Sequence, residues 1–178
     1  MAYYTYILSS LPALRFGVPA PIAPGEFLRI SKGLIPEEEH GLLSRIFGGE
    51  LPTGNNDILK KWITFDTTLR NELVKIRSAR RGEGHEKYIR PGGSEDFAIT
   101  HIALHAQRTP SILKSVLVLD KARWDYLNEL SIGHYFDLDA LLIYAFELSI
   151  LKKWDLVNEA DNDSLLSGLL MDNAGAKQ

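Results

Sequence analysis

The sequence predicts an all-α protein, and two of its features favour that fold. Apolar residues recur at every third or fourth position through the clearest amphipathic stretch, residues 56–80. Most prolines and glycines stand between such stretches, at places where a helix would end. No internal repeat of constant length is visible. We therefore expect an irregular bundle of about five or six helices, forming a single domain over residues 1–172 with a disordered tail over residues 173–178.

The first quarter of the chain is rich in tyrosine and proline. Residues 1–11 alternate loosely and fit either a minor strand or an opening helical turn. Residues 12–25 contain four prolines and indicate an extended connector. Short helices are expected over residues 24–32 and 36–47, because acidic residues open the second one and Gly48 follows it.

Residues 56–80 carry the clearest helical pattern. One of the polar residues Asn55, Asn56 or Asp57 is placed to cap the start of this helix. Most charged residues fall off the apolar stripe, as in a helix with one buried face. The stripe consists of Ile58, Trp62, Phe65, Leu69, Leu73 and Ile76.

The second half predicts three more helices. After a charged, glycine-rich loop over residues 81–96, helices are expected over residues 97–108 and 110–130. The last long helix should cover residues 138–158, and its apolar residues on two sides indicate a central place in the bundle. A short docked helix is expected over residues 165–171. The three tryptophans each fall on an apolar stripe and are expected in the core, at Trp62, Trp124 and Trp154.

The composition excludes several classes of site. The chain has 178 residues, no cysteine, 20 Lys+Arg and 23 Asp+Glu, for a formal net charge of -3. Without cysteine there is no disulfide, no thiolate metal ligand and no thiol nucleophile. The N-terminus lacks the basic start of a signal peptide, and no stretch approaches the roughly 18 apolar residues of a membrane helix. We expect a soluble protein of the cytoplasm.

Two histidine motifs suggest chemistry. His101 and His105 are four residues apart on a predicted helix, where both can face one metal ion. The glutamate of a zinc protease helix is missing and no third ligand is evident, so we expect surface histidines and no metal or other cofactor. His134, Asp137 and Asp139 could perform acid–base catalysis. A helix end and a helix cap explain the same residues without chemistry, and no catalytic residue is assigned.

A basic segment is the candidate interaction surface. The segment Arg77–Arg90 carries several cations, although Glu83 and Glu86 offset part of the charge. A nucleic-acid-binding helical module is one alternative, and an enzyme using the His134–Asp139 turn is another. No phosphate-binding glycine loop and no Gly-x-Ser-x-Gly elbow is present. The residues expected to bind a partner protein are Arg70, Arg77, Arg80, Arg81, Tyr88 and Arg90.

Several segments together resemble one bacterial family of uncharacterised proteins. They are Tyr3–Pro12, Phe16–Gly17, Trp62, Leu69–Leu73, Ile76–Ala79, Arg123–Leu130, His134–Asp139 and Tyr144–Trp154. The most specific of them are the Arg-Asn-Glu-Leu helix and the block Trp-x-x-Leu-x-Glu-Leu followed by Tyr-Phe-Asp. In these segments the chain resembles the family called domain of unknown function 2764, and the likeness covers about residues 1–155.

The resemblance implies a role beside a rotary ATPase. Members of that family are typically encoded among the subunits of bacterial V-type (A/V-type) ATPases. A further likeness is to the helical stalk protein of those enzymes that couples the rotor ring to the central stalk. What this implies is a non-catalytic accessory component, or one similar to that coupling protein. Such a component would bind other ATPase subunits, carry no nucleotide, and reach the membrane only through the complex.

Overall fold

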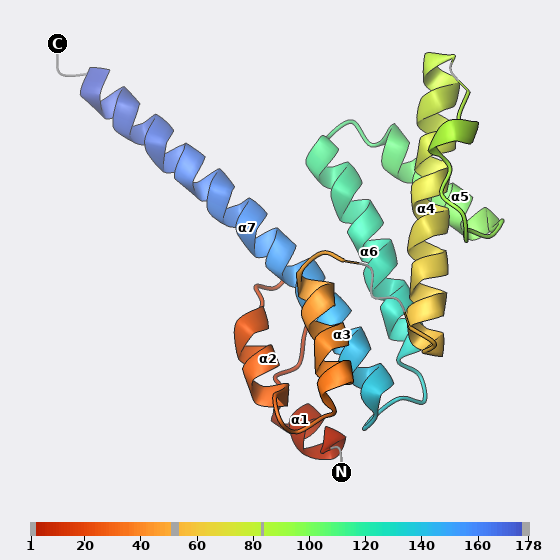
Figure 1. Ribbon diagram of the computed structural model, residues 1–178. Coiled ribbons are helices and arrows are strands. Elements are labelled where there is room, and N and C mark those ends of the chain that lie inside the picture. The colour runs from red at the N-terminus through yellow and green to blue at the C-terminus, as the bar shows by residue number, and fades with distance from the viewer. Residues whose placement is uncertain (1–2, 51–53, 83, 176–178) are drawn as a thin grey trace.

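The fold is entirely helical. The computed structural model describes residues 3–50, 54–82 and 84–175, with side chains described up to residue 160. Over these residues it contains seven α-helices, one short 3₁₀-helix and no strand (Figure 1). The predicted all-α class is confirmed, with seven helices in place of the expected five or six.

Of the two alternatives for residues 1–11, a minor strand or a helical turn, the structure has the helix. Residues Tyr4–Ser10 form α1, so the strand alternative is wrong. Tyr4, Ile7, Leu8 and Leu11 recur at helical spacing and pack toward the core, with Ile7 fully buried. This spacing, which the loose alternation of the tyrosines obscures, explains the helix.

Two short helices follow the proline-rich connector. They are α2, Pro24–Ser31, and α3, Glu37–Phe47, which confirm the two helices expected over residues 24–32 and 36–47. Phe27 of α2 is fully buried and stacks on the Tyr144 ring, with 5.4 Å between the ring centroids. The connector is held by Pro12, whose carbonyl oxygen accepts a hydrogen bond from the Tyr144 hydroxyl at 2.9 Å.

A second group of helices comprises α4, α5 and α6. Their bounds are Asp57–Arg81, Phe97–Arg108 and Ile112–Leu130, close to the predicted ranges. Asn56 caps α4, because its side-chain oxygen accepts a hydrogen bond from the Leu59 backbone N–H at 2.9 Å. Asp96 and Ser111 cap α5 and α6 in the same way.

The last helix, α7, runs over Leu138–Gly175 and is longer than predicted. No proline or glycine occurs between residues 155 and 167, so nothing in the sequence ends the helix near residue 158. The segment 165–171 is therefore part of α7 and not a separate helix, and its side chains lie outside the described ones. The expected disordered tail begins too early, since residues 173–175 are helical, while residues 176–178 lie outside the described part.

The first half of α7 is the shared element of the core. Helices α1, α2 and α3 pack against it, and α6 and α4 also contact it (Figure 1). Leu141, Leu142, Ala145 and Leu148 are fully buried, which confirms the predicted central position. The far half of α7 projects away from the other helices (Figure 1). Within the described residues, no helix is both long enough and apolar enough to cross a bilayer.

Candidate functional site

The basic end of α4 holds three of the six predicted partner-binding residues, and a fourth, Tyr88, lies beside it. Arg77, Arg80 and Arg81, which we call the arginine cluster, are exposed and precede Gly82, whose left-handed backbone (φ 69°) ends the helix. A hollow of about 370 Å³ lies between the three arginines and Gln107 of α5. A second, of about 270 Å³, lies between Arg77, Arg81 and the exposed ring of Tyr88. The cluster thus borders two adjoining concave surfaces.

The arginine cluster differs in its pairing from three of the four cations earlier in α4, the exception being Lys61. Lys60, Arg70 and Lys75 each pair with a carboxylate three or four residues earlier, at N–O distances of 3.8, 2.6 and 2.6 Å. Among the described residues, no carboxylate pairs with any arginine of the cluster. The carbonyl end of a helix favours positive charge, so the fold tolerates the arginines there. The surface is therefore suited to receive an anionic group.

Two of the predicted binding residues do not join this cluster. Arg70 lies about two helical turns earlier, and its Nε donates to Asp66 at 2.6 Å. Arg90 is exposed but lines neither hollow. The sequence grouped Arg70 and Arg90 with the cluster because it shows neither which side of α4 a residue faces nor which part of the loop lies beside the helix end.

The segment 84–96 is fastened to α4 through Arg90, Gly93 and Ser94. The buried Asn71 side chain donates to the Arg90 carbonyl oxygen at 2.8 Å and accepts from the Arg90 N–H at 2.9 Å. Thr68 Oγ1 accepts from the Ser94 N–H at 2.8 Å. At Gly93 an added Cβ would lie 2.9 Å from Asn71 Nδ2, so the close approach requires glycine. These contacts fix the path of residues 90–94, which follow closely after the 3₁₀-helix Glu86–Tyr88 beside the arginine cluster.

The two predicted helix histidines are both exposed on α5. His105 borders a groove toward α6, whereas His101 does not line it. In the part of the chain that the structure describes, the single group of three or more metal-ligand side chains lies elsewhere, at the turn before α7. The structure therefore adds no third ligand to this pair.

The turn before α7 brings together His134, Asp137 and Asp139, with ligand atoms within 4.8 Å of one another. His134 Nδ1 lies 2.8 Å from Asp137 Oδ2 and 3.4 Å from Asp139 Oδ2. Asp137 Oδ1 also accepts from the Ala140 N–H at 2.9 Å, which makes Asp137 the cap of α7. Asn56 donates to Asp139 Oδ1 at 2.5 Å. Each carboxylate is thus engaged in holding helix ends, and this arrangement explains the motif without catalysis.

A buried ionic network is the feature that the sequence pattern missed. Asp66 and Asp120 are 4% and 1% exposed, and Arg123 bridges them with N–O distances of 2.8 and 3.1 Å. Trp154 Nε1 donates to Asp120 Oδ2 at 3.0 Å, and Lys153 pairs with the same oxygen. The signal was present: Asp66 follows Trp62 by four residues, and Asp120 precedes Trp124 by four, so both fall on an apolar stripe.

This network joins three helices and explains the tryptophans. Trp62 and Trp124 are buried as predicted, while Trp154 is partly buried and bonded to Asp120. Because Asp66 lies on α4, Asp120 on α6 and Trp154 on α7, the contacts link these elements through charge and hydrogen bonds. A substitution that removes the partners of either aspartate would leave an unpaired negative charge in the interior.

Burial changes the titration of two residues on α7. Burial raises the pKa of the Glu147 carboxyl to about 7, and it raises the pKa of the Tyr144 hydroxyl to about 12, with a smaller contribution from the Glu147 charge. Both side chains lie one helical turn apart on α7. Glu147 is therefore partly protonated near neutral pH.

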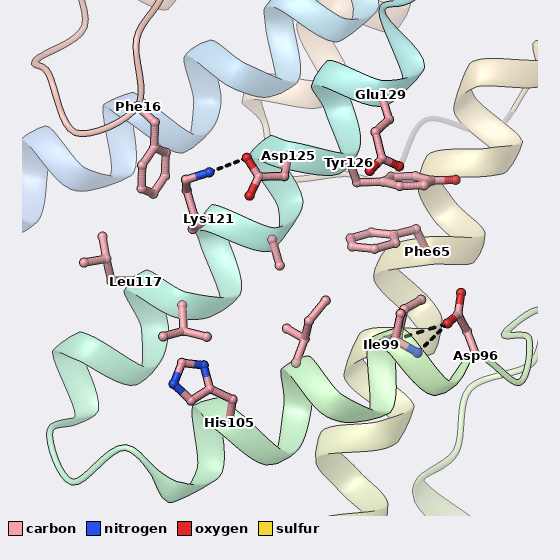
Figure 2. Close-up of a pocket in the computed structure, with 14 residues that line it drawn as sticks. Phe16, Phe65, Asp96, Ile99, His105, Leu117, Lys121, Asp125, Tyr126 and Glu129 are labelled. Atoms are coloured by element: carbon pink, nitrogen blue, oxygen red, sulfur yellow. Dashed lines mark hydrogen bonds and ion pairs between the residues drawn. The ribbon is translucent and has the colours of Figure 1, made fainter.

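An apolar groove of about 620 Å³ lies between α5 and α6. Figure 2 shows His105 and Leu117 toward one end, and Tyr126, Phe65, Asp96 and Glu129 toward the other. The rings of Phe65 and Tyr126 stack with 4.1 Å between their centroids. Sequence reasoning did not find this groove, because it depends on how the two helices diverge.

Comparison with known proteins adds no family or fold relative: the chain matches no family model, no curated protein and no solved structure.

Proposed function

We propose that this chain is a non-catalytic interaction component of a bacterial V-type rotary ATPase. In this proposal it is an accessory protein of the cytoplasm, or one similar to the coupling protein of the central stalk. It binds other subunits of the complex through the arginine cluster. The assignment to that complex rests on the sequence resemblance over residues 1–155. The assignment of the contact surface rests on the geometry at the end of α4.

The observation that carries the contact surface is the contrast in pairing along α4. Three of the four earlier cations of α4 have a carboxylate partner within the helix, Lys61 being the exception. The arginine cluster instead gathers three cations without a carboxylate partner among the described residues, and it borders two hollows. Arginine and tyrosine are the side chains in which binding energy concentrates at protein interfaces. Tyr88 adds an exposed ring beside the cluster. An acidic surface of another ATPase protein would match this arrangement.

Two alternative functions have less support from the geometry. For an enzyme at the His134 turn, the contacts of Asp137 and Asp139 have a structural explanation, since both carboxylates hold helix ends. A nucleic-acid-binding module would use the same arginines as a protein partner. The chain's net charge of -3 is unlike that of most nucleic-acid-binding domains.

The test is co-purification of rotary-ATPase subunits with the tagged full chain from native cells. Replacing Arg77, Arg80 and Arg81 together with alanine should lower capture of those subunits by about tenfold or more. The matched control replaces three other exposed cations, Lys32, Arg45 and Lys61, and so removes the same charge. It should keep capture intact.

Two results would overturn the proposal. Capture that excludes ATPase subunits would refute the assignment to that complex. Equal capture by the cluster variant and the control would show that the cluster is only a solvated surface. Salt-sensitive binding of a nucleic-acid probe, lost in the cluster variant, would favour the nucleic-acid alternative instead.

A further inference from the structure

The groove between α5 and α6 is an apolar surface on which another helix could pack. Ala98 and Ile102 of α5 line it together with Leu117 and Tyr126 of α6. Phe16 of the connector lies at one side of it (Figure 2). Two neighbouring helices that each leave an apolar row open between them form a trough. An amphipathic helix fills such a trough with residues at spacings of three and four.

The apolar surface extends beyond the groove along α6. Leu117 lines the groove and is 41% exposed, and Leu113, one turn earlier on the same face, is 46% exposed. A small molecule that filled only the hollow would leave Leu113 in water. A helix lying along the groove would cover both leucines, so the extent of the apolar surface favours a helical segment.

The charges around the groove are unequal at its two ends. Lys121 and Asp125 pair with each other on α6, which leaves little net charge near the middle. At the Tyr126 end, Asp96 and Glu129 have no cation partner among the described residues. Their charges, after the larger effect of burial, raise the pKa of the Tyr126 hydroxyl, which places both carboxylates near that ring. The apolar row therefore ends at a pair of negative charges.

We propose that this groove binds an amphipathic α-helix of a partner protein that carries a lysine or arginine at the end seated beside Asp96 and Glu129. Leu113 and Leu117 supply the apolar contact, and the two carboxylates fix the direction of the bound helix. This site lies on a different surface from the arginine cluster and does not depend on the proposed function. Loss of either site would leave the other measurable.

The experiment uses two synthetic peptides of about 20 residues, long enough to form a helix. Both peptides carry the same leucines at spacings of three and four. One peptide has two lysines at one end, and the other has two glutamates there. Binding to the full chain is measured by calorimetric titration. The lysine peptide should bind at least about tenfold more tightly than the glutamate peptide, and added salt should reduce the difference.

Variants of the chain locate the binding. Glu129→Lys should abolish the preference for the lysine peptide, and Ala98→Trp, which fills the groove from an exposed position, should weaken both peptides by about tenfold. The matched control for charge reversal is Glu38→Lys at an exposed position of α3. This control should change neither the affinity for the two peptides nor the preference between them. Melting curves establish that each variant is folded.

Three outcomes would overturn the proposal. One is no binding of the lysine peptide at about 1 mM. Another is equal affinity for the two peptides. The third is self-association of the chain that Ala98→Trp abolishes, because the occupant would then be a second copy.

Discussion

Single residues in this protein show how charge is tolerated in a helical core. Asp66 and Asp120 are nearly inaccessible, yet both are paired, and the shared partner Arg123 has a side chain only 16% exposed. Arg70 pairs with the same Asp66 but remains 48% exposed. The inner bridge therefore governs the cost of charge in the core, since exposed pairs stabilise by only about 0–1 kcal/mol. Because its pair with Asp66 is exposed, we expect loss of Arg70 to lower the free energy of unfolding less than loss of Arg123.

Glu147 is the residue whose environment predicts a pH effect. Its pKa is about 7 in the folded chain against 4.5 in its ordinary state, because burial disfavours the charged form. Between these values the unfolded chain loses the proton while the folded chain keeps it. The free energy of unfolding should therefore fall as pH rises from 4.5 to 7, by at most about 3 kcal/mol.

The measurement is chemical denaturation at pH 5 and pH 8. Glu147→Gln removes the charge, so this variant should equal the wild type at pH 5 and exceed it at pH 8. The control is Glu159→Gln, an exposed glutamate on the same helix, which should follow the wild type at both pH values. Equal stability of Glu147→Gln and wild type at pH 8 would contradict the effect of burial.

At the scale of elements, apolar periodicity predicted most helices. It could not predict the path of a loop that polar side chains hold in place. The stripe from Ile58 to Ile76 predicted α4 to within a residue at each end, because six apolar side chains repeat the period. The path of segment 84–96 depends instead on Asn71 and Thr68, polar residues of α4 whose pairing no local pattern reveals. The arginine cluster was predictable as a run of charge, while its pairing with surrounding residues was not.

Asn71→Ala should free the segment 84–96 without unfolding α4. The change removes the acceptor of the Arg90 N–H and the donor to the Arg90 carbonyl oxygen. Leaving these groups to water should cost about 1–3 kcal/mol of local stability. The Arg90 amide should then exchange its hydrogen about tenfold faster or more, as followed by NMR.

The control for this change is Asn128→Ala on α6, where the exposed amide donates to the Trp124 carbonyl oxygen within its own helix. Exchange at Arg90 should be unchanged in that variant. If exchange at Arg90 stays slow in Asn71→Ala, the segment is held by contacts other than these two hydrogen bonds.

At the scale of the whole molecule, α7 joins two groups of helices. Helices α1, α2 and α3 pack on one side of its first half, while α4 and α6 contact it from the other group. Phe27 reaches α7 through Tyr144 from the first group, and Trp62 reaches it through Phe146 from the second, with 4.9 Å between the latter two ring centroids. A helix buried on both sides cannot lose one partner without exposing apolar surface to water.

This shared core predicts that the two groups unfold together. Phe27→Ala empties a fully buried position in α2 and should lower the free energy of unfolding by about 3–5 kcal/mol. The three tryptophans all lie on α4, α6 and α7, so their fluorescence reports the second group and the shared helix. The denaturation midpoint seen by tryptophan fluorescence should therefore fall as far as the midpoint seen by circular dichroism, although Phe27 lies in the other group. Arg29→Ala, an exposed change on the same helix, should leave both midpoints nearly in place. A fluorescence midpoint that stays fixed while the dichroism curve splits into two steps would mean that α1–α3 fold independently, and that α7 does not couple the groups.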